Sequence, residues 1–432
     1  MPTQKVLIIG AGVAGSIAAF WLAKHDYTIT VIERSRSEQK VGQGIEIEEP
    51  ATQIVKMMGI HPQLEAVRTG ELGFQVEDES GARWCRFEAG KLSPTGELEL
   101  MRGDLTEVLY RAADQAGNVT YHFETTVQSI VETGEKVVME LQNRKDGAAR
   151  TEEYDFVIGA DGARSKTRQL IMGPPEQLNY YKRVGAYVAY FSIKREAHDW
   201  PYSRLCHFPG RRIVWMRPTT KDADTTSVYL IHLNDNIPAL HQANAAGDRQ
   251  KQKEAFAELF SGLGWETPRV IEQMMKAQNF YSDELQQVKL PTWSQGRVVL
   301  LGDSAWAPTP FTGQGNHLAI LGAWTLAQEM SRDRTTAAFA NYEKRFRAYV
   351  ENAQEIPLGG YAPYLVNPET SLGIWVCRSC LLMLDYGVRF FRWSGLGNWL
   401  PKSAEDQIKH EDFDLQVDQD GMMNGNSDLK AQ

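Results

Sequence analysis

Three glycines near the start of the chain, Gly10, Gly12 and Gly15, have the spacing Gly-x-Gly-x-x-Gly. In this pattern the first glycine allows a tight turn, the second leaves room for a pyrophosphate, and the third lets a helix pack closely on a strand. Glu33 follows about 20 residues later, where a carboxylate can bind a ribose hydroxyl. The residue types indicate a dinucleotide-binding turn, and a glycine-rich turn without a ligand is the alternative.

The elements around these glycines are the ones that such a site needs. The apolar run 6–9 reads as a strand, the Ala-rich stretch up to about residue 24 reads as a helix, and 27–33 reads as a second strand. Val13 and Ala14 would begin the helix, where free amides and the helix dipole favour a phosphate. The segment therefore predicts a βαβ unit with a phosphate site at its first turn.

Two later strands run directly into an aspartate. The strand predicted at 154–159 leads to Gly-Ala-Asp-Gly, which contains Asp161, and the strand at 296–301 leads to Asp303. An aspartate at the end of such a strand can hold sugar hydroxyls, and the loop after Asp303 leads to a helix start with free backbone amides. The contact residues predicted in this loop are Pro310, Gly313, Gly315 and Asn316. Helices are predicted at 318–330 and 335–352.

Two further stretches could face the same ligand. Gln43 and Gly44 precede a short strand and could lie against a cofactor ring, although an ordinary glycine turn explains them equally well. Arg102 stands where a strand end runs into an amphipathic helix within 98–110, so its guanidinium could reach a phosphate. A solvated arginine at a helix start is the alternative for Arg102.

Between about 184 and 233 the pattern changes to alternating, aromatic-rich strands. This pattern predicts an antiparallel sheet distinct from the parallel one and suited to forming a wall for an apolar ligand. A polar helix is predicted at 244–263. The candidate substrate-binding residues on the sheet are His207, Arg217, Tyr229 and His232, and local hydrogen bonding is the alternative role for each.

The composition excludes several classes of protein. The 432 residues carry 46 Lys and Arg against 55 Asp and Glu, a net charge of −9 that argues against nucleic acid binding. Four scattered cysteines do not form a disulfide framework, and no zinc or other metal site is expected. No leader segment is recognisable before the first strand, so we expect a cytoplasmic protein.

The C-terminal part is expected to be helical and then disordered. The apolar stretch 372–391 is interrupted by Arg378, Asp385 and Arg389, which disfavours a membrane span and favours a helix packed on the body. Cys377 and Cys380 within it have the spacing of a redox pair, but packing is the preferred role. The polar, acidic tail 404–432 is predicted to be disordered.

Taken together, these blocks resemble the single-component flavin-dependent monooxygenases of the aromatic-hydroxylase type. This family includes para-hydroxybenzoate and salicylate hydroxylases, tetracycline-inactivating monooxygenases and fungal natural-product hydroxylases and epoxidases. The resemblance covers roughly residues 4 to 350 and rests on the order and spacing of four blocks. They are the glycine turn with Glu33, the Arg102 helix, the Asp161 block with Arg164 and Ser165, and the Asp303 loop.

The resemblance implies an α/β fold with a Rossmann-like FAD-binding domain like that of para-hydroxybenzoate hydroxylase, an inserted antiparallel substrate sheet and C-terminal helices. The implied FAD-binding domain comprises 1–72, 99–178 and 280–356, and the substrate domain comprises 73–98 and 179–279. C-terminal helices take up 357–403. Non-covalent FAD would occupy the sites above, and Arg34 would match the basic residue that often follows the acid.

The activity that the resemblance implies uses NADPH or NADH and O2 to hydroxylate or epoxidise an aromatic or other unsaturated small molecule. The oxygen would pass through a flavin C4a-hydroperoxide, so no catalytic side chain is nominated. An FAD-dependent reductase or dehydrogenase without O2 activation is the alternative, and a non-catalytic flavin-binding protein is a third. No pattern specifies the oligomeric state.

Three residues depart from the family pattern. Trp306 stands where the family often has a histidine, which leaves open what this position does here. Glu46 and Glu48 place acidic side chains on a strand that is commonly apolar.

Overall fold

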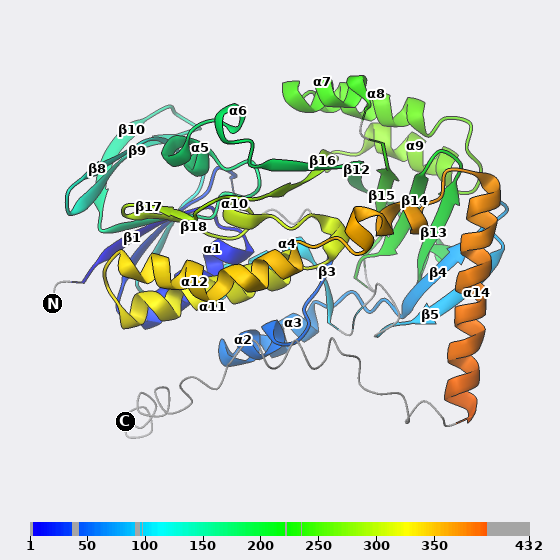
Figure 1. Ribbon diagram of the computed structural model, residues 1–432, viewed down its shortest axis with the longest axis horizontal. Helices are drawn as coiled ribbons and strands as arrows, with labels where there is room; N and C mark the ends of the chain where they lie inside the picture. The colour runs from blue at the N-terminus through cyan, green and yellow to red at the C-terminus, as the bar shows by residue number, and fades with distance from the viewer. Residues whose placement is uncertain are drawn as a thin grey trace.

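The computed structural model describes residues 3–36, 43–90, 96, 98–220, 223–234 and 236–394, with side chains up to Val388. Figure 1 shows two large sheets joined by long strands, with helices on their outer faces. The predicted tail 404–432 lies outside the described residues, as do residues 395–403 of the predicted C-terminal helices.

The first sheet has six strands and carries the predicted βαβ unit. Its order is β17 (Ser294–Gln295), β18 (Val298–Leu300), β11 (Phe156–Gly159), β1 (Lys5–Ile9), β2 (Thr28–Ile32) and β7 (Val119–His122). All neighbours pair in parallel except β17 with β18. Because the central strands β1, β11 and β18 are apolar apart from Lys5, both faces of the sheet can be covered.

The two faces of this sheet are covered by different layers. Val6 and Ile8 of β1 pack into a core with the helices α1 (Val13–Lys24), α4 (Arg102–Asp114), α11 (Gly315–Arg332) and α12 (Ala337–Ala353). Leu7 and Ile9 point the other way, against a three-stranded sheet of β8 (Thr125–Thr133), β9 (Lys136–Asn143) and β10 (Ala149–Tyr154). The helices predicted at 318–330 and 335–352 are confirmed as α11 and α12, each slightly displaced or extended.

The second sheet has seven strands and matches the predicted aromatic-rich region. Its order is β16 (Tyr281–Val288), β12 (Tyr181–Lys194), β15 (Thr225–His232), β14 (Arg212–Pro218), β13 (Ser203–Phe208), β4 (Gly73–Glu77) and β5 (Arg83–Glu88). It is antiparallel as predicted, except that β13 and β4 run in parallel. The sheet also includes β16, although the expected division assigns 280–356 to the FAD-binding domain.

The single helix predicted at 244–263 is wrong. The chain forms two helices here, α7 (Pro238–Ala246) and α8 (Arg249–Leu259), followed by α9 (Thr267–Lys276). Gly247 ends α7 with a φ of +64°, and the Asp248 side chain accepts a hydrogen bond from the Lys251 amide at the start of α8. A left-handed glycine followed by an Asp cap therefore divides the helix. These helices cover one face of the seven-stranded sheet.

A small two-stranded sheet joins the two large ones. Its strands β3 (Gly44–Glu46) and β6 (Glu99–Met101) pair with Gly44 opposite Met101 and Glu46 opposite Glu99. Ile45 and Leu100 point into the core of the first sheet, so alternation turns Gly44, Glu46 and Glu99 toward the second. The short helices nearby and elsewhere are α2 (Ala51–Met57), α3 (His61–Ala66), α5 (Lys166–Met172) and α6 (Pro175–Leu178).

The chain's last described elements are α13 (Ala362–Val366) and α14 (Ser371–Ser394). As predicted, α14 packs on the body, where it contacts β5 and β13. Among the described residues one helical stretch, Ser371–Val388, is long and apolar enough to cross a membrane by length and composition alone. Cys377 is half-buried and Cys380 is exposed, so the packing role predicted for this pair is wrong for Cys380.

Candidate functional site

The carboxyl ends of three parallel strands bring the predicted nucleotide blocks to one edge of the first sheet. The Ala160 amide donates to the Ile9 carbonyl at 2.8 Å, and the Leu301 amide donates to the Gly159 carbonyl at 2.9 Å. The glycine turn, the Asp161 block and Asp303 therefore leave the sheet side by side. Ligands of open α/β sheets bind at such an edge.

Packing explains why the glycine turn requires glycine at two positions and has open space at the third. A Cβ atom on Gly10, whose φ is +109°, would lie 2.4 Å from the Ala160 carbonyl oxygen. A Cβ atom on Gly15 would lie 2.0 Å from the Gly10 oxygen, whereas nothing lies within 4 Å of a Cβ built on Gly12. The open space at Gly12 matches the approach that a pyrophosphate needs.

The helix starts at this edge have free donors. Neither α1 nor α11 has a side-chain cap, and Val13 and Ala14 begin α1 as predicted. The loop before α11 contains Pro310 in a single helical turn and Gly313 at a φ of +67°, and Gly315 and Asn316 begin the helix itself. These uncapped first turns fit the negatively charged groups of a dinucleotide.

Glu33 directly follows β2 and points back to the glycine turn. Its carboxylate accepts hydrogen bonds from the Ala11 amide at 3.1 Å and from the Ser35 amide at 2.9 Å. Glu33 therefore lies beside the glycine turn, and its predicted contact with a ribose hydroxyl stays a prediction. Arg34 is exposed, and its carbonyl accepts a hydrogen bond from the Arg144 guanidinium.

Asp161 has a local role in this structure. Its carboxylate accepts hydrogen bonds from the Ser165 hydroxyl at 2.5 Å and from the Thr167 amide at 3.0 Å. Ser165 in turn caps α5 by accepting from the Arg168 amide. Asp161 therefore supports the start of α5, and its predicted cofactor contact stays a prediction.

Asp303 and Arg102 lie close enough to interact. Burial raises the pKa of Asp303, and the positive charges of Arg102 and Arg168 oppose this shift. Arg102 begins α4, and its amide donates to the Gln43 carbonyl at 3.0 Å, which joins the predicted Gln43–Gly44 segment to the same site. Asp303 is half-buried at the end of the strand, so its carboxylate is in a position to bind ligand hydroxyls.

The Gly44 segment touches the second sheet through one short hydrogen bond. The Gly44 amide donates to the Tyr229 hydroxyl at 2.6 Å. On this face of the sheet the ring of Tyr229 packs edge-on against Tyr190 at 5.0 Å and Trp215 at 5.4 Å between ring centroids. Phe311, from the loop that contains Pro310 and Gly313, packs on the same face. The two predicted halves of the site therefore meet at an aromatic wall.

Arg217 is buried and neutralised beside this wall. Its guanidinium contacts the Glu71 carboxylate at 3.2 Å and the Glu99 carboxylate at 2.8 Å. Burial raises the pKa of Glu99, which Arg217 opposes, and Glu71 and Glu99 hold the pKa of Arg217 well above its ordinary value against its burial. Arg217 therefore binds the β3–β6 segment to the second sheet.

The unexpected acid Glu46 lies next to this ion pair. Burial, together with the negative charges of Glu48 and Glu99, raises the pKa of Glu46 to about 8. Its carboxyl group is therefore mostly protonated at neutral pH. The acidic strand that departs from the family pattern therefore places a carboxyl group with a raised pKa at the junction of the two sheets.

This raised pKa predicts how stability depends on pH. An unfolded glutamate titrates near 4.5 and folded Glu46 near 8, so between these values the folded state binds more protons and stability falls as pH rises. Glu46→Gln is expected to remove this fall and to raise the melting temperature at pH 8 more than at pH 5. Thermal unfolding at both pH values measures the effect, with Glu153→Gln on the exposed β10 as the control. Equal shifts at both pH values would contradict the assignment.

The two predicted histidines lie on opposite faces of the second sheet. His207 pairs with Ile213, on the face that contains Trp215 and Tyr229, and burial lowers its pKa to about 4. His232 lies two residues after Leu230 on β15 and therefore on the same face, which α7–α9 cover. Burial lowers its pKa to about 4 as well. The structure therefore brings His207 onto the aromatic face and separates His232 from it.

Trp306 belongs to the core behind the site. It is 1 % exposed, its indole nitrogen donates to the Tyr342 hydroxyl at 3.1 Å, and its ring packs against Trp293 and Phe346. A histidine at this position would not fill the same volume. The position is therefore a packing position in this chain.

Four residues of the site were not among the sequence predictions. Tyr190 and Trp215 complete the aromatic wall, and Glu71 and Glu99 neutralise Arg217. Alternation along the strands could have assigned Tyr190 and Trp215 to the face of Tyr229. The pairing of two acids with one arginine depends on contacts between distant strands, and no local pattern marks it.

Comparisons with known proteins agree with this arrangement. The model of the FAD binding domain family matches residues 3–355. Monooxygenase CTB7 from Cercospora beticola is 35% identical over 89% of this chain and 92% of that protein. FAD-dependent monooxygenase asL4 from Sarocladium schorii is 28% identical over 96% of this chain and 99% of that protein.

Among solved structures, the tetracycline destructase Tet(55) superposes with a TM-score of 0.73 at 28% identity, covering 89% of this chain and 97% of the other. The glycine turn, the Asp303 loop and the second sheet thus occur together in a fold already known to hold FAD. The uncapped helix starts, the open space at Gly12 and the position of Asp303 fit that cofactor. The chain belongs to the FAD-dependent monooxygenases, with the FAD-binding domain and hydroxylase-type fold of that family.

Proposed function

We propose that this enzyme uses NADPH or NADH and O2 to hydroxylate or epoxidise an aromatic or other unsaturated organic molecule that binds against the wall of Tyr190, Trp215 and Tyr229. A role in tailoring a natural product is consistent with the fungal relatives. FAD, when bound, supplies the redox chemistry that delivers the oxygen atom. The family assignment favours this activity over a reductase that does not activate O2.

The observation that carries the proposal is the hydrogen bond from the Gly44 amide to the Tyr229 hydroxyl. It joins the segment beside Arg102 and Asp303 to the aromatic face, so a ligand on that face lies next to the predicted cofactor site. The Tyr229 oxygen accepts this bond, which leaves its own proton to donate to a polar group of the substrate. Burial raises the pKa of Tyr229 to about 12, so the hydroxyl stays protonated and oriented at neutral pH.

Two features of the chain keep the reaction away from bulk water. Phe311, from the loop that follows Asp303, packs against the apolar cluster of the second sheet that contains Val188. Arg217 and its carboxylates bind β3 and β6 to the same sheet. A dry, closed site strengthens the electrostatic contacts that orient a substrate and limits side reactions.

The test is the consumption of NAD(P)H and O2 by the purified, FAD-loaded enzyme with a panel of planar phenols and polycyclic aromatic compounds, including tetracycline. We expect slow NAD(P)H oxidation alone and faster oxidation, with matching O2 uptake and a product heavier by one oxygen atom, when a substrate is present. Mass spectrometry with ¹⁸O2 identifies the source of that atom. NAD(P)H oxidation without O2 uptake would instead support the reductase.

A variant of the aromatic wall tests the role of the Tyr229 hydroxyl. Tyr229→Phe keeps the ring contacts with Tyr190 and Trp215 but removes the hydroxyl, and it is expected to raise the KM for a substrate that this hydroxyl binds. The loss of one hydrogen bond corresponds to about 0.5–1.5 kcal/mol. An unchanged KM and kcat for Tyr229→Phe would remove the hydroxyl from substrate binding.

The cofactor contacts can be tested independently of the substrate. If Asp303 binds ribityl hydroxyls and Arg102 binds the neighbouring phosphates, Asp303→Ala and Arg102→Ala should each weaken FAD binding by roughly 1.5–3 kcal/mol. Titration of the apoprotein with FAD, followed by flavin fluorescence, measures this affinity. Arg111→Ala, which removes an exposed arginine from the last turn of the helix that Arg102 begins, provides a comparison. Wild-type affinity in both variants would reject the assignment.

A further inference from the structure

The outer face of α14 is apolar and carries no charge within the described side chains. Its large exposed residues are between 46% and 71% exposed, and they are Leu372, Trp375, Val376, Met383, Leu384 and Tyr386. We call these residues, with Ser379 and Cys380 between them, the α14 stripe. Figure 1 shows α14 at the outer edge of the molecule, with β4, β5 and β13 on one side of it. Monomeric proteins rarely expose so continuous an apolar surface.

The two ionic residues of this stretch are turned toward the body. Arg378 is 7% exposed and donates to the His207 carbonyl at 2.9 Å. Asp385 is 5% exposed and accepts a hydrogen bond from the Arg86 amide at 3.3 Å. Ile374, which is 4% exposed, and Leu381, which packs against Val76 and Phe87, lie on the body side as well. The side of α14 that meets the sheet therefore combines polar and apolar contacts, and both ionic groups are on that side.

The spacing within the stripe is that of a helix–helix contact. Leu372, Val376, Ser379, Met383 and Tyr386 follow one another at alternating intervals of four and three residues. This alternation is the a/d repeat by which one helix inserts its side chains between those of another. The small Ser379 and Cys380 stand at the middle of the repeat, where two helix axes can approach closely.

We infer that the α14 stripe is a dimer interface, on which α14 of a second copy of this chain packs antiparallel about a twofold axis near Ser379. Such an interface is self-complementary, so an uncharged stripe meets an uncharged stripe and no ionic group is buried without a partner. A lipid surface fits less well because the face opposite the stripe is occupied by the sheet and the net charge is −9. Helices that lie on membranes carry cations on a solvated polar face, and anionic leaflets repel an acidic protein.

The symmetry places Cys380 next to its own copy, and this gives a direct test. In the full-length, FAD-loaded enzyme a short bifunctional maleimide is expected to join two chains through Cys380, which is exposed and carries a free thiol. Cys380→Ser should abolish the cross-link, and Cys377→Ser should preserve it. Light scattering after size exclusion should give twice the mass of one chain.

A charged substitution in the stripe provides the second test. Met383→Glu should shift the enzyme to monomers while the flavin absorbance and the turnover per chain stay unchanged. Val131→Glu, which alters an exposed apolar residue on β8, should leave the dimer intact. If Met383→Glu fails to fold, the Cys380 cross-link in the otherwise unchanged enzyme still tests whether α14 forms the dimer interface. A monomeric wild-type enzyme, a dimer that neither cross-links through Cys380 nor responds to Met383→Glu, or a monomer that sediments with phosphatidylcholine vesicles would overturn the inference.

Discussion

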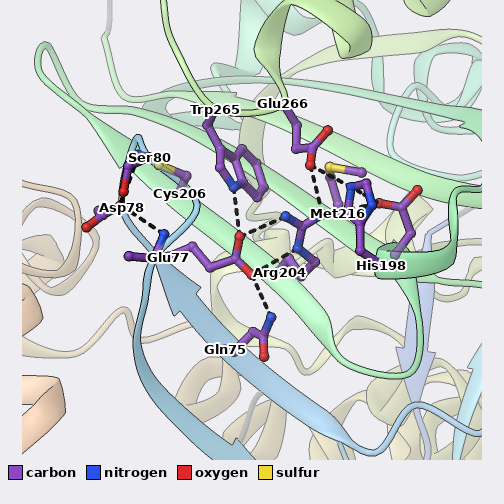
Figure 2. A network of polar contacts seen from close by, with 12 residues as sticks. Gln75, Glu77, Asp78, Ser80, His198, Arg204, Cys206, Met216, Trp265 and Glu266 are labelled. Atoms are coloured by element: carbon purple, nitrogen blue, oxygen red, sulfur yellow. Dashed lines mark hydrogen bonds and ion pairs between the residues drawn. The ribbon is translucent and has the colours of Figure 1, made fainter.

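Replacing Arg204 by methionine is expected to lower the free energy of unfolding by about 3–5 kcal/mol, because it leaves the buried Glu77 carboxylate without a cation. Figure 2 shows Arg204 at the centre of a network between β4, β13 and the segment that leads into α9. The guanidinium contacts Glu77 at 2.8 Å, Asp199 at 3.2 Å and Glu266 at 3.1 Å, and it is almost fully buried.

Each carboxylate that contacts Arg204 also has other partners, so the loss of Arg204 affects the three carboxylates differently. Glu77 also accepts hydrogen bonds from Gln75 at 2.6 Å and from the Trp265 indole at 2.8 Å. Asp199 and Glu266 each contact Arg269 as well as Arg204. After the substitution, Glu77 keeps two neutral donors but no cation, so the variant's stability should improve as the pH falls and the carboxyls become protonated.

Urea denaturation of the FAD-saturated protein measures this effect. Lys276→Met provides the matched control because it removes a cation from the exposed pair with Glu272 on α9, where an ion pair contributes at most about 1 kcal/mol. Adding Glu77→Gln to Arg204→Met should recover part of the loss. If Arg204→Met lowered the free energy of unfolding no more than Lys276→Met does, the network would contribute little to the stability of the fold.

Arg217→Met is expected to have an effect of similar size, about 3–5 kcal/mol, because Glu71 and Glu99 then lose the cation between them. In contrast to the Arg204 network, this pair connects the two sheets at the candidate site. Its loss should therefore also reduce turnover, since β3 is no longer bound next to Tyr229. Both the denaturation midpoint and the substrate KM should change in this variant, whereas Arg204→Met should change mainly the midpoint.

Two further variants test whether the loss of stability in Arg217→Met comes from the unpaired carboxylates. Combining Arg217→Met with Glu99→Gln removes one of the stranded carboxylates and should restore part of the stability. Arg68→Met, which removes an arginine from an exposed contact with Glu65 at 3.5 Å, should have an effect below about 1 kcal/mol. An Arg217→Met variant with unchanged stability would show that Glu71 and Glu99 are neutral without it.

The backbone turns of the nucleotide half of the site could be predicted from the sequence, whereas the contacts of their residues with FAD stay predictions. Gly10 and Asp303 each follow the end of a strand, and Gly15 lies in the first turn of the helix that follows Gly10. Local patterns of this kind are visible in a single sequence because neighbouring residues determine the turn. The βαβ geometry accounts for the parallel pairing of β1 with β2, whereas the positions of β11, β18 and β7 in the sheet were not predicted.

The substrate half depends on contacts that local patterns do not encode. The face on which His232 lies is fixed by the register of β15 against β14, and the partners of Arg217 come from β6 and from the segment before β4. The break between α7 and α8 was missed for a different reason: the polar sequence on both sides suits a helix, and the left-handed Gly247 outweighs it. Cys380 was assigned to packing because apolar composition does not reveal which side of a helix meets the body.

The parallel pairing of β13 with β4 has a consequence for how the chain matures during synthesis. Ser203 on β13 contacts Gly73, which precedes it by 130 residues. The β4–β5 hairpin therefore leaves the ribosome long before the strand that completes its sheet, and its inner edge stays unpaired until then. Such long-range closure slows folding and exposes strand edges to aggregation. Residues 181–288 produced alone would lack the β4 partner of β13, so recombinant work on this half requires the early hairpin to be supplied with it.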